Sequence, residues 1–415
     1  MAGMAKDPKG VRLDEVAALV AKRAAAAEAQ TAQAFARALY GGVAAVDLLE
    51  FPADTLVGIT LALWACARKR SPGEPRVRVF NPTIEEHGWL STHTIVEVVT
   101  DDMPFLVDSV VNALNQIGLT VQLLIHPIVR VRRGTEGRVA AFGPAAGPDA
   151  VTESVQHVQV TRQVGDERLA EIERRIVETL ASVRAAVEDW RAARGRIDDV
   201  IRELEDDPPP LPADEIEEGK AFLRWLGNDH FLFLGCREYR LVRKGNEDYS
   251  EIVEGSGLGV LRDVAPESLE RHGRALPAVV AQSVRQKNLL MITKATSRSR
   301  VHRPVYMDYV GVRRFDKKGE VVGEHRFLGL LTSAAYNRNP REIPQLRRKV
   351  ARVIERAGFP PGSHSAKALQ NILETYPRDE LFQIDDATLL DTVLGILHLE
   401  ERQRIRLFVR RDTYA

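Results

Sequence analysis

The stretch that decides the fold is VEVVTDDMPFLVDSVVNALNQIGLTVQLLIHPIVRVRR, residues 96–133. It begins within the segment 92–99, whose apolar run predicts a strand buried on both faces. Asp102 is expected to cap the next helix, with Pro104 in its first turn. Gly118 ends that helix, and 119–132 predicts a further strand, interrupted at His126 and Pro127. The stretch therefore indicates strand, turn, helix, glycine and strand.

The flanking segments extend this pattern. Residues 77–80 and 155–164 predict two more strands, and 166–190 predicts a second helix. Two helices interleaved with about four mostly antiparallel strands are most simply arranged as a ferredoxin-like sandwich. Ahead of it, the apolar spacing predicts one long amphipathic helix over 13–39 and another over 54–69. These two helices form a leader, residues 1–75.

A linker follows the second helix of the sandwich. The acidic run 203–207 precedes Pro208, Pro209, Pro210 and Pro212, and such a segment predicts a domain boundary. Beyond it, a helix is expected at 216–226, with a hairpin turn at 316–319. Strands of an antiparallel sheet are expected at 231–242, 289–293, 306–313 and 321–331.

The last part of the chain is mainly helical. Helices are expected at 343–357, 365–376 and 387–401. Ser363 precedes the second of them as a good N-cap, which we favour over a catalytic reading of Ser363 and His364. Residues 405–410 predict a final strand.

The totals restrict the class of protein. The 415 residues carry 58 Lys and Arg against 58 Asp and Glu, so no basic field favours nucleic acid as a partner. No apolar run predicts a membrane span. The only two cysteines, Cys66 and Cys236, fit a reducing compartment better than a disulfide scaffold, and a cytoplasmic location is expected.

No motif for catalysis or metal binding stands out. Gly255, Gly257 and Gly259 follow a strand-like segment, but the third glycine comes one residue too early for a dinucleotide fingerprint and no helix pattern follows. A glycine turn is the better interpretation. The ten histidines show no helical zinc spacing, and neither cysteine has a second one nearby.

The 96–133 stretch is similar to the N-terminal ACT-like module of large bacterial NAD-specific glutamate dehydrogenases. Further sequence motifs resemble that family and occur in the family's order: NDHFLFLGCREYRL (228–241), GSGLGVLR (255–262), KATSRSRVHRPV (294–305), HSAKALQNILETYPRDELFQI (364–384) and the ending ERQRIRLFVRRDTYA.

The resemblance implies an α+β chain of several modules. The leader, 1–75, precedes an ACT-type βαββαβ sandwich at 76–204 and a PAS-like antiparallel domain at 212–336. A helical segment at 341–403 and the first strand of a truncated second ACT-like module at 404–415 complete it. The dehydrogenase domain lies downstream in such enzymes, and no lysine here sits between close glycines as their reactive lysine does. No catalytic, cofactor-binding or metal-binding residue is therefore expected, and NAD belongs to the full-length enzyme.

The candidate site is the loop before the first sandwich helix: Asp101, Asp102, Met103, Pro104 and Phe105, with Gly118 at the far end of that helix. Backbone N–H groups at the helix start can receive an amino-acid carboxylate. Phe105, however, stands where ligand-binding ACT domains usually have glycine, and the two aspartates repel a carboxylate. An interface role and effector binding therefore both remain. If Phe105 plugs the groove, Phe105→Ala should cost about 3 kcal/mol and Asp101→Asn should be nearly neutral.

A second candidate is the basic run that contains Lys294, Arg298, Arg300 and Arg303. It can bind an anion or the acidic face of a partner, or it can be a solvated loop.

The resemblance implies a regulatory and oligomerisation fragment of an enzyme that oxidises L-glutamate to 2-oxoglutarate and ammonia with NAD. Its expected partners are the downstream catalytic domain, further copies of the chain and an amino-acid effector. The alternative is a stand-alone ACT/PAS-type amino-acid sensor that acts on a protein partner.

Overall fold

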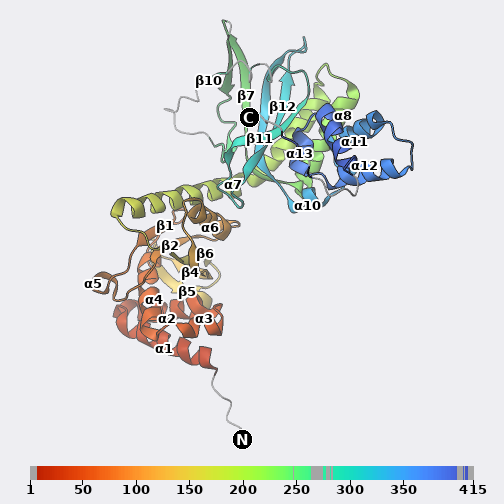
Figure 1. Cartoon of the computed structure of the whole chain (residues 1–415). Coiled ribbons are helices and arrows are strands. Elements are labelled where there is room, and N and C mark those ends of the chain that lie inside the picture. The colour runs from red at the N-terminus through yellow and green to blue at the C-terminus, as the bar shows by residue number, and fades with distance from the viewer. Residues whose placement is uncertain are drawn as a thin grey trace. The chain divides into compact units, whose positions relative to one another are not determined.

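The structure is a computed structural model that describes residues 7–245, 247–262, 274–276, 281, 284–399, 405 and 407–409. The chain divides into two compact units (Figure 1). Unit 1 comprises Met1–Arg184 together with Arg300–Pro304, and unit 2 comprises Ala185–Ser299 and Val305–Ala415. The division falls inside a helix and not at the proline run, because that helix contributes buried residues to the core of unit 2 as far as Leu204.

The leader is a set of helices packed against one another. Its elements are α1 (Pro8–Arg23), η1 (Ala26–Glu28), α2 (Ala29–Gly41), α3 (Ala45–Glu50) and α4 (Ala53–Ala67). The prediction of one helix over 13–39 is wrong, because Ala24 has extended backbone angles and the chain turns there. The turn lets Val16 and Val20 of α1 share one core with Phe35 and Leu39 of α2, which a straight helix could not do.

Unit 1 contains a six-stranded antiparallel sheet. Its elements are β1 (Arg76–Phe80), α5 (Ile84–His87), β2 (Thr94–Asp101), α6 (Leu106–Gln116), β3 (Val121–Ile125), β4 (Ile128–Arg133), β5 (Val139–Phe142), η2 (Gly143–Ala146), β6 (Val151–Val160) and α7 (Asp166–Asp206). The predicted interruption at His126 and Pro127 separates β3 from β4, which both pair with β6.

The strand order is β1-β2-β6-β4-β5. A ferredoxin-like βαββαβ sheet has its last strand, which follows the second helix, beside the first. Here that edge position belongs to β1, which precedes β2 in the chain and pairs with it. The α+β class and the interleaving of helix and sheet are as expected, but the closing strand comes before the sandwich helices.

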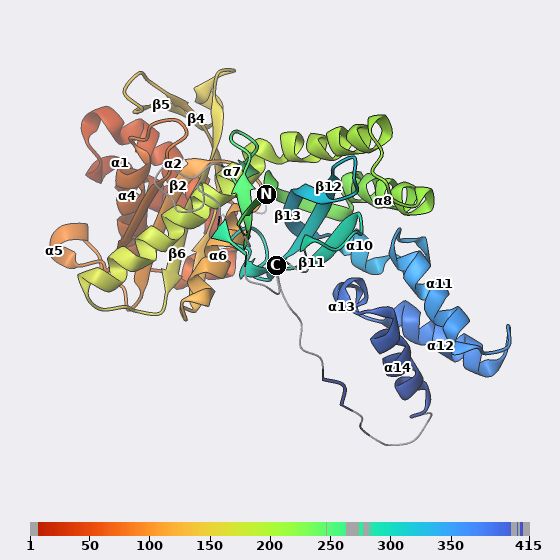
Figure 2. The same cartoon turned by 90° about the horizontal axis from the view of Figure 1, so that it is seen from above.

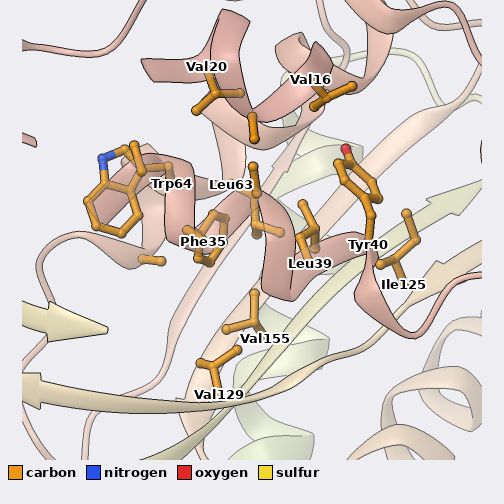
Figure 3. Close-up of a cluster of buried hydrophobic side chains, with 14 of the residues drawn as sticks. Val16, Val20, Phe35, Leu39, Tyr40, Leu63, Trp64, Ile125, Val129 and Val155 are labelled. Carbon is orange, nitrogen blue, oxygen red and sulfur yellow. The ribbon is translucent and has the colours of Figure 1, made fainter. Parts of the chain in front are cut away.

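Both faces of this sheet are buried at its central strands, β2 and β6. Val99 of β2, Val129 of β4 and Val155 of β6 pack against the leader, in a core with Phe35 and Leu63 (Figure 3). The intervening residues Val96 and Val98 lie on the opposite face, the side on which Figure 1 shows α6. The leader is therefore an integral layer of unit 1.

Unit 2 contains a second antiparallel sheet, in the order β10-β8-β7-β13-β12-β11 with β9 beside β7. The strands are β7 (Phe231–Lys244), β8 (Glu247–Ile252), β9 (Leu258–Gly259), β10 (Arg274–Ala275), β11 (Leu290–Arg298), β12 (Tyr306–Phe315) and β13 (Val321–Leu331). α8 (Ala213–Trp225), η3 (Leu226–His230) and the C-terminal part of α7 supply helical residues to its core. The predicted turn at 316–319 joins β12 to β13, with Gly319 at φ 77°.

The remaining elements of unit 2 are α10 (Ser333–Asn337), η5 (Pro340–Glu342), α11 (Leu346–Ala357), α12 (His364–Thr375), α13 (Arg378–Gln383) and α14 (Asp386–Leu397). Figure 2 shows α11 to α14 gathered together, and they share one hydrophobic cluster. Ser363 caps α12 as predicted, since its hydroxyl accepts from the Ala366 N–H at 3.1 Å. The predicted final strand lies largely outside the described residues, and those described there, 405 and 407–409, are in no strand.

Candidate functional site

The predicted ligand loop leads into α6 through a left-handed residue. Phe105 is the N-cap of α6 at φ 71° and ψ 1°, so the helix begins at Leu106 and neither an Asp102 cap nor Pro104 in the first turn is found. A positive φ favours glycine and strains a residue with a side chain. The position thus has a backbone geometry that glycine adopts without strain.

Residues 300–304, which belong to unit 1, lie on the start of α6. The His302 N–H donates to the Ser109 hydroxyl at 3.0 Å, and the Asn112 amide donates to the His302 carbonyl at 2.6 Å. The His302 ring lies 3.1 Å from an Asp108 carboxylate oxygen and has its centroid 5.2 Å from that of Phe105. His302 also has a positive φ, of 63°. Two strained residues far apart in the sequence therefore meet beside the helix start, where a carboxylate was expected.

Phe105 is half-buried and faces His302, so its ring packs against this segment at the start of α6. The left-handed backbone turns the side chain away from the position that it would have inside the helix. Phe105 and residues 300–304 together cover the start of α6. No feature of the sequence 96–133 predicts this contact. The motif 294–305 contains His302 but does not indicate where His302 packs.

Truncation of Phe105 is therefore expected to have a modest effect. Phe105→Ala removes one ring contact and some half-buried area, so the unfolding free energy of unit 1 should fall by about 1 kcal/mol. Chemical denaturation followed by circular dichroism measures this, with Val164→Ala, at an 83% exposed position, as the neutral control. A loss of 3 kcal/mol or more would restore the plugged-core interpretation.

Asp101 is part of an ion network. Arg70 and Arg184 donate to its two carboxylate oxygens at 2.6 and 2.7 Å, and the Gly73 N–H donates at 3.2 Å. Burial raises the pKa of Asp101, but the hydrogen bonds from the two arginines outweigh burial and the net pKa lies below its usual value. These contacts argue against a neutral effect of Asp101→Asn, because neighbouring cations stabilise the charge that it removes.

The inner part of the network is centred on Glu153 of β6. Arg133 donates to both of its carboxylate oxygens at 2.6 and 2.7 Å, and Arg70 donates at 2.7 Å. The side chains of Glu153 and Arg70 are each 1% exposed. Arg133 also donates to the Ala67 carbonyl at the end of α4. These contacts join the leader to the sheet.

The other loop residues have backbone or surface roles. The Asp102 N–H donates to the Thr152 carbonyl at 3.1 Å, Met103 is half-buried and Pro104 is exposed. Gly118, at φ 82°, ends α6 as predicted, with its N–H donating to the Asn115 carbonyl.

The basic run does not form one cluster of open cations. The Lys294 ammonium lies 2.6 Å from Asp308 and 3.0 Å from Asp379 in unit 2, and its side chain is 12% exposed. Burial lowers the pKa of Lys294, but the two carboxylates outweigh burial and raise it overall. Arg298 lies over the Tyr306 ring, Arg300 lies 3.3 Å from Glu178, and Arg303 is half-buried. Lys294 therefore serves an internal ion pair.

The glycine segment 255–259 forms turns and one short strand pairing. A Cβ on Gly259, at φ 62°, would lie 2.0 Å from the Leu234 carbonyl oxygen, so only glycine fits there. Gly259 donates its N–H to the Asp189 carboxylate at 2.7 Å, and Arg262 donates to the same carboxylate at 2.6 Å. No helix begins in the described residues directly after it, through Arg262. An N–H already bound to a carboxylate does not offer the phosphate cradle of a dinucleotide site.

Over the described ranges, no group of three or more His, Cys, Asp or Glu side chains has the arrangement of a metal site. In those same ranges, no helix is long and apolar enough to cross a membrane.

Comparison with known proteins gives two family matches. Residues 35–176 match the glutamate dehydrogenase ACT1 domain, and residues 343–402 match helical motif 1 of glutamate dehydrogenase. The first match begins within α2, in keeping with a leader that packs on the ACT sheet.

Similar proteins carry the name NAD-specific glutamate dehydrogenase. That of Halomonas elongata is 42% identical over 394 residues, which are 94% of this chain and 24% of the relative. That of Pseudomonas aeruginosa is 36% identical over 92% of the chain and 24% of the relative. That of Mycobacterium tuberculosis is 29% identical over 87% of the chain and 21% of the relative. The chain thus spans about a quarter of the length of these relatives.

Proposed function

Because this chain belongs to the family of NAD-specific glutamate dehydrogenases, whose N-terminal quarter it matches, we propose that it is a regulatory and assembly segment without its own active site. The complete enzyme would oxidise L-glutamate to 2-oxoglutarate and ammonia with NAD. In this proposal a domain downstream in the same polypeptide binds NAD and performs the chemistry.

The observation that carries the proposal is the ACT1 match over 35–176, because ACT-type modules serve regulation and assembly and not hydride transfer. The ion pairs around Gly259 agree with it, since they occupy the nearest counterpart of a nucleotide loop.

We extend the proposal to the fold of unit 2, the assembly of the chain and its effector. Unit 2 has its first and last long strands, β7 and β13, side by side in the interior of the sheet. This arrangement is typical of PAS-like sheets and supports a PAS-like module. We further propose a cytoplasmic homo-oligomer that responds to an amino-acid effector. A stand-alone sensor acting on a protein partner remains the second candidate, because ACT-type modules also occur in such proteins.

Removal of unit 1 from the complete polypeptide tests the regulatory role. The deletion should stop at residue 184, because Ala193 to Leu204 of α7 supply core residues to unit 2. We expect glutamate-dependent reduction of NAD to survive, while oligomer size or the response of the rate to added amino acids changes.

Initial rates and light scattering of the two proteins provide the measurement, with the full polypeptide carrying Val164→Ala as control. If oligomer size and amino-acid response are both unchanged by the deletion, the regulatory role is refuted. If the natural polypeptide ends near residue 415, the second candidate, a stand-alone sensor acting on a protein partner, is the correct interpretation.

A further inference from the structure

A cavity of about 530 Å³ lies within unit 2, between the end of α7 and the β12–β13 hairpin. Apolar side chains, among them Leu204, Val312 and Phe315, line part of it, and Pro208–Pro210 line another part. Pro210 packs on the hairpin, since a Cβ on Gly319 would lie 3.2 Å from its ring. The proline run is therefore a wall with fixed backbone angles, and the cavity is preformed and of a size suited to a small molecule.

A buried polar group lies on the wall of this cavity. The His325 Nε2 atom lies 2.8 Å from one oxygen of Glu203, and Arg314 Nε donates to the other oxygen at 2.9 Å. The hydrogen bond from His325 is the main reason that the pKa of Glu203 falls to about 2, with burial opposing it and Arg314 adding to it. Glu203 is thus an ionised acceptor, so His325 Nε2 carries the proton. In the neutral ring, Nδ1 is then an acceptor.

Several polar groups that line the cavity have no protein partner among the described residues. His325 is 8% exposed, and its Nδ1 forms no hydrogen bond. Arg314 uses Nε for Glu203 and Nη1 for Glu238, which leaves Nη2. Asp207 and Lys317 are exposed on the same lining and form no ion pair within the described ranges. The cavity therefore offers two cationic donors, Arg314 and Lys317, and the carboxylate of Asp207 as an acceptor.

We propose that this cavity binds a small zwitterion of amino-acid size. Arg314 and Lys317 would receive its carboxylate by charge-assisted hydrogen bonds. Asp207 would accept from its ammonium group, which the negative C-terminal end of α7 also favours. A ligand with only one of these charges would leave either the two cations or Asp207 without a partner.

The inference deepens the proposed function and rests on it for the regulatory consequence alone. It places the effector in unit 2, whereas the sequence placed it at the loop before α6, where residues 300–304 already lie on the helix start. Binding itself is testable on this chain without any catalytic domain. If no amino acid binds, the regulatory role of unit 1 is not affected. If the deletion of unit 1 changes neither oligomer size nor regulation, the proposal that this cavity binds a ligand is not affected.

Isothermal titration calorimetry with glycine, alanine, aspartate, glutamate, propionate and propylamine tests the proposal. We expect at least one of the amino acids to bind saturably, and propionate and propylamine to bind at least about tenfold more weakly, since each loses one set of charge-assisted bonds. Val322→Trp should abolish binding by filling the cavity, which Val322 lines at a half-exposed position. Lys317→Ala should weaken it about tenfold.

Lys287→Ala is the matched control, because Lys287 is an exposed lysine of unit 2 that lies 2.8 Å from Glu320 and does not line the cavity. Circular dichroism confirms that each variant is folded. The proposal is overturned if no amino acid binds, if Val322→Trp binds as the original chain does, or if propionate or propylamine alone binds as tightly as the amino acids. If Val322→Trp does not fold, Lys317→Ala decides, and unchanged affinity of that variant overturns the proposal.

Discussion

Glu153→Ala is expected to lower the unfolding free energy of unit 1 by about 3–5 kcal/mol. Arg70 and Arg133 both donate to this carboxylate, and their side chains are 1% and 5% exposed. The substitution would leave two buried guanidinium groups without their common counter-charge. Arg70 keeps its bond to Asp101, but Arg133 loses its carboxylate partner. A buried charge without its partner costs far more than the net stability that an intact pair contributes.

Urea denaturation with one probe for each unit measures the effect, because a single transition is not assured in a chain of two units. Glu136→Ala is the matched control, since Glu136 is 74% exposed and lies 3.7 Å from Arg138. It should change stability by less than about 1 kcal/mol. If Glu153→Ala remains within 1 kcal/mol of the original chain, the network does not hold the leader to the sheet.

The sequence predicted the segments whose pattern is local. The elements that lie close to their expected ranges are β2, β7, β12, β13, α4, α12 and α14. Their apolar alternation, helical spacing or caps can be recognised within each segment alone. The turn at 316–319 and the Gly118 helix end were found for the same reason. The family resemblance was confirmed by the ACT1 and helical-motif matches.

The remaining features depend on partners that are distant in the chain. The break at Ala24 carries no glycine or proline, and it follows from the packing of α1 on α2 and of both on the sheet. The division between units falls inside α7 because two separate cores share that helix. A proline run marks a stiff segment, and here that segment lines a cavity of unit 2.

The contacts of the candidate loop were not predicted from the sequence. Asp101 was expected to repel a ligand, but Arg70 and Arg184 neutralise it, and Arg70 is separated from it by 31 residues. His302 is separated from Asp108 by 194 residues. Charge and spacing within 101–105 cannot indicate such neighbours.

We expect this chain to have no dehydrogenase activity of its own. Asp189 accepts from the Gly259 N–H, and its negative charge stands where a pyrophosphate would have to approach. The hydrogen bond from Arg262 holds the pKa of Asp189 below its usual value, so the repelling charge persists at neutral pH. No reactive lysine lies between close glycines in the sequence. The purified chain should therefore not reduce NAD with glutamate.

Calorimetric titration of NAD into the 415-residue chain shows whether this segment holds a site for the coenzyme. A full-length NAD-specific glutamate dehydrogenase, titrated in the same buffer, is the positive control for NAD binding. The account predicts no saturable heat for this chain beyond dilution, with or without glutamate. Saturable binding of NAD at micromolar concentrations would contradict it, because a segment that only regulates and assembles the enzyme has no site for the coenzyme.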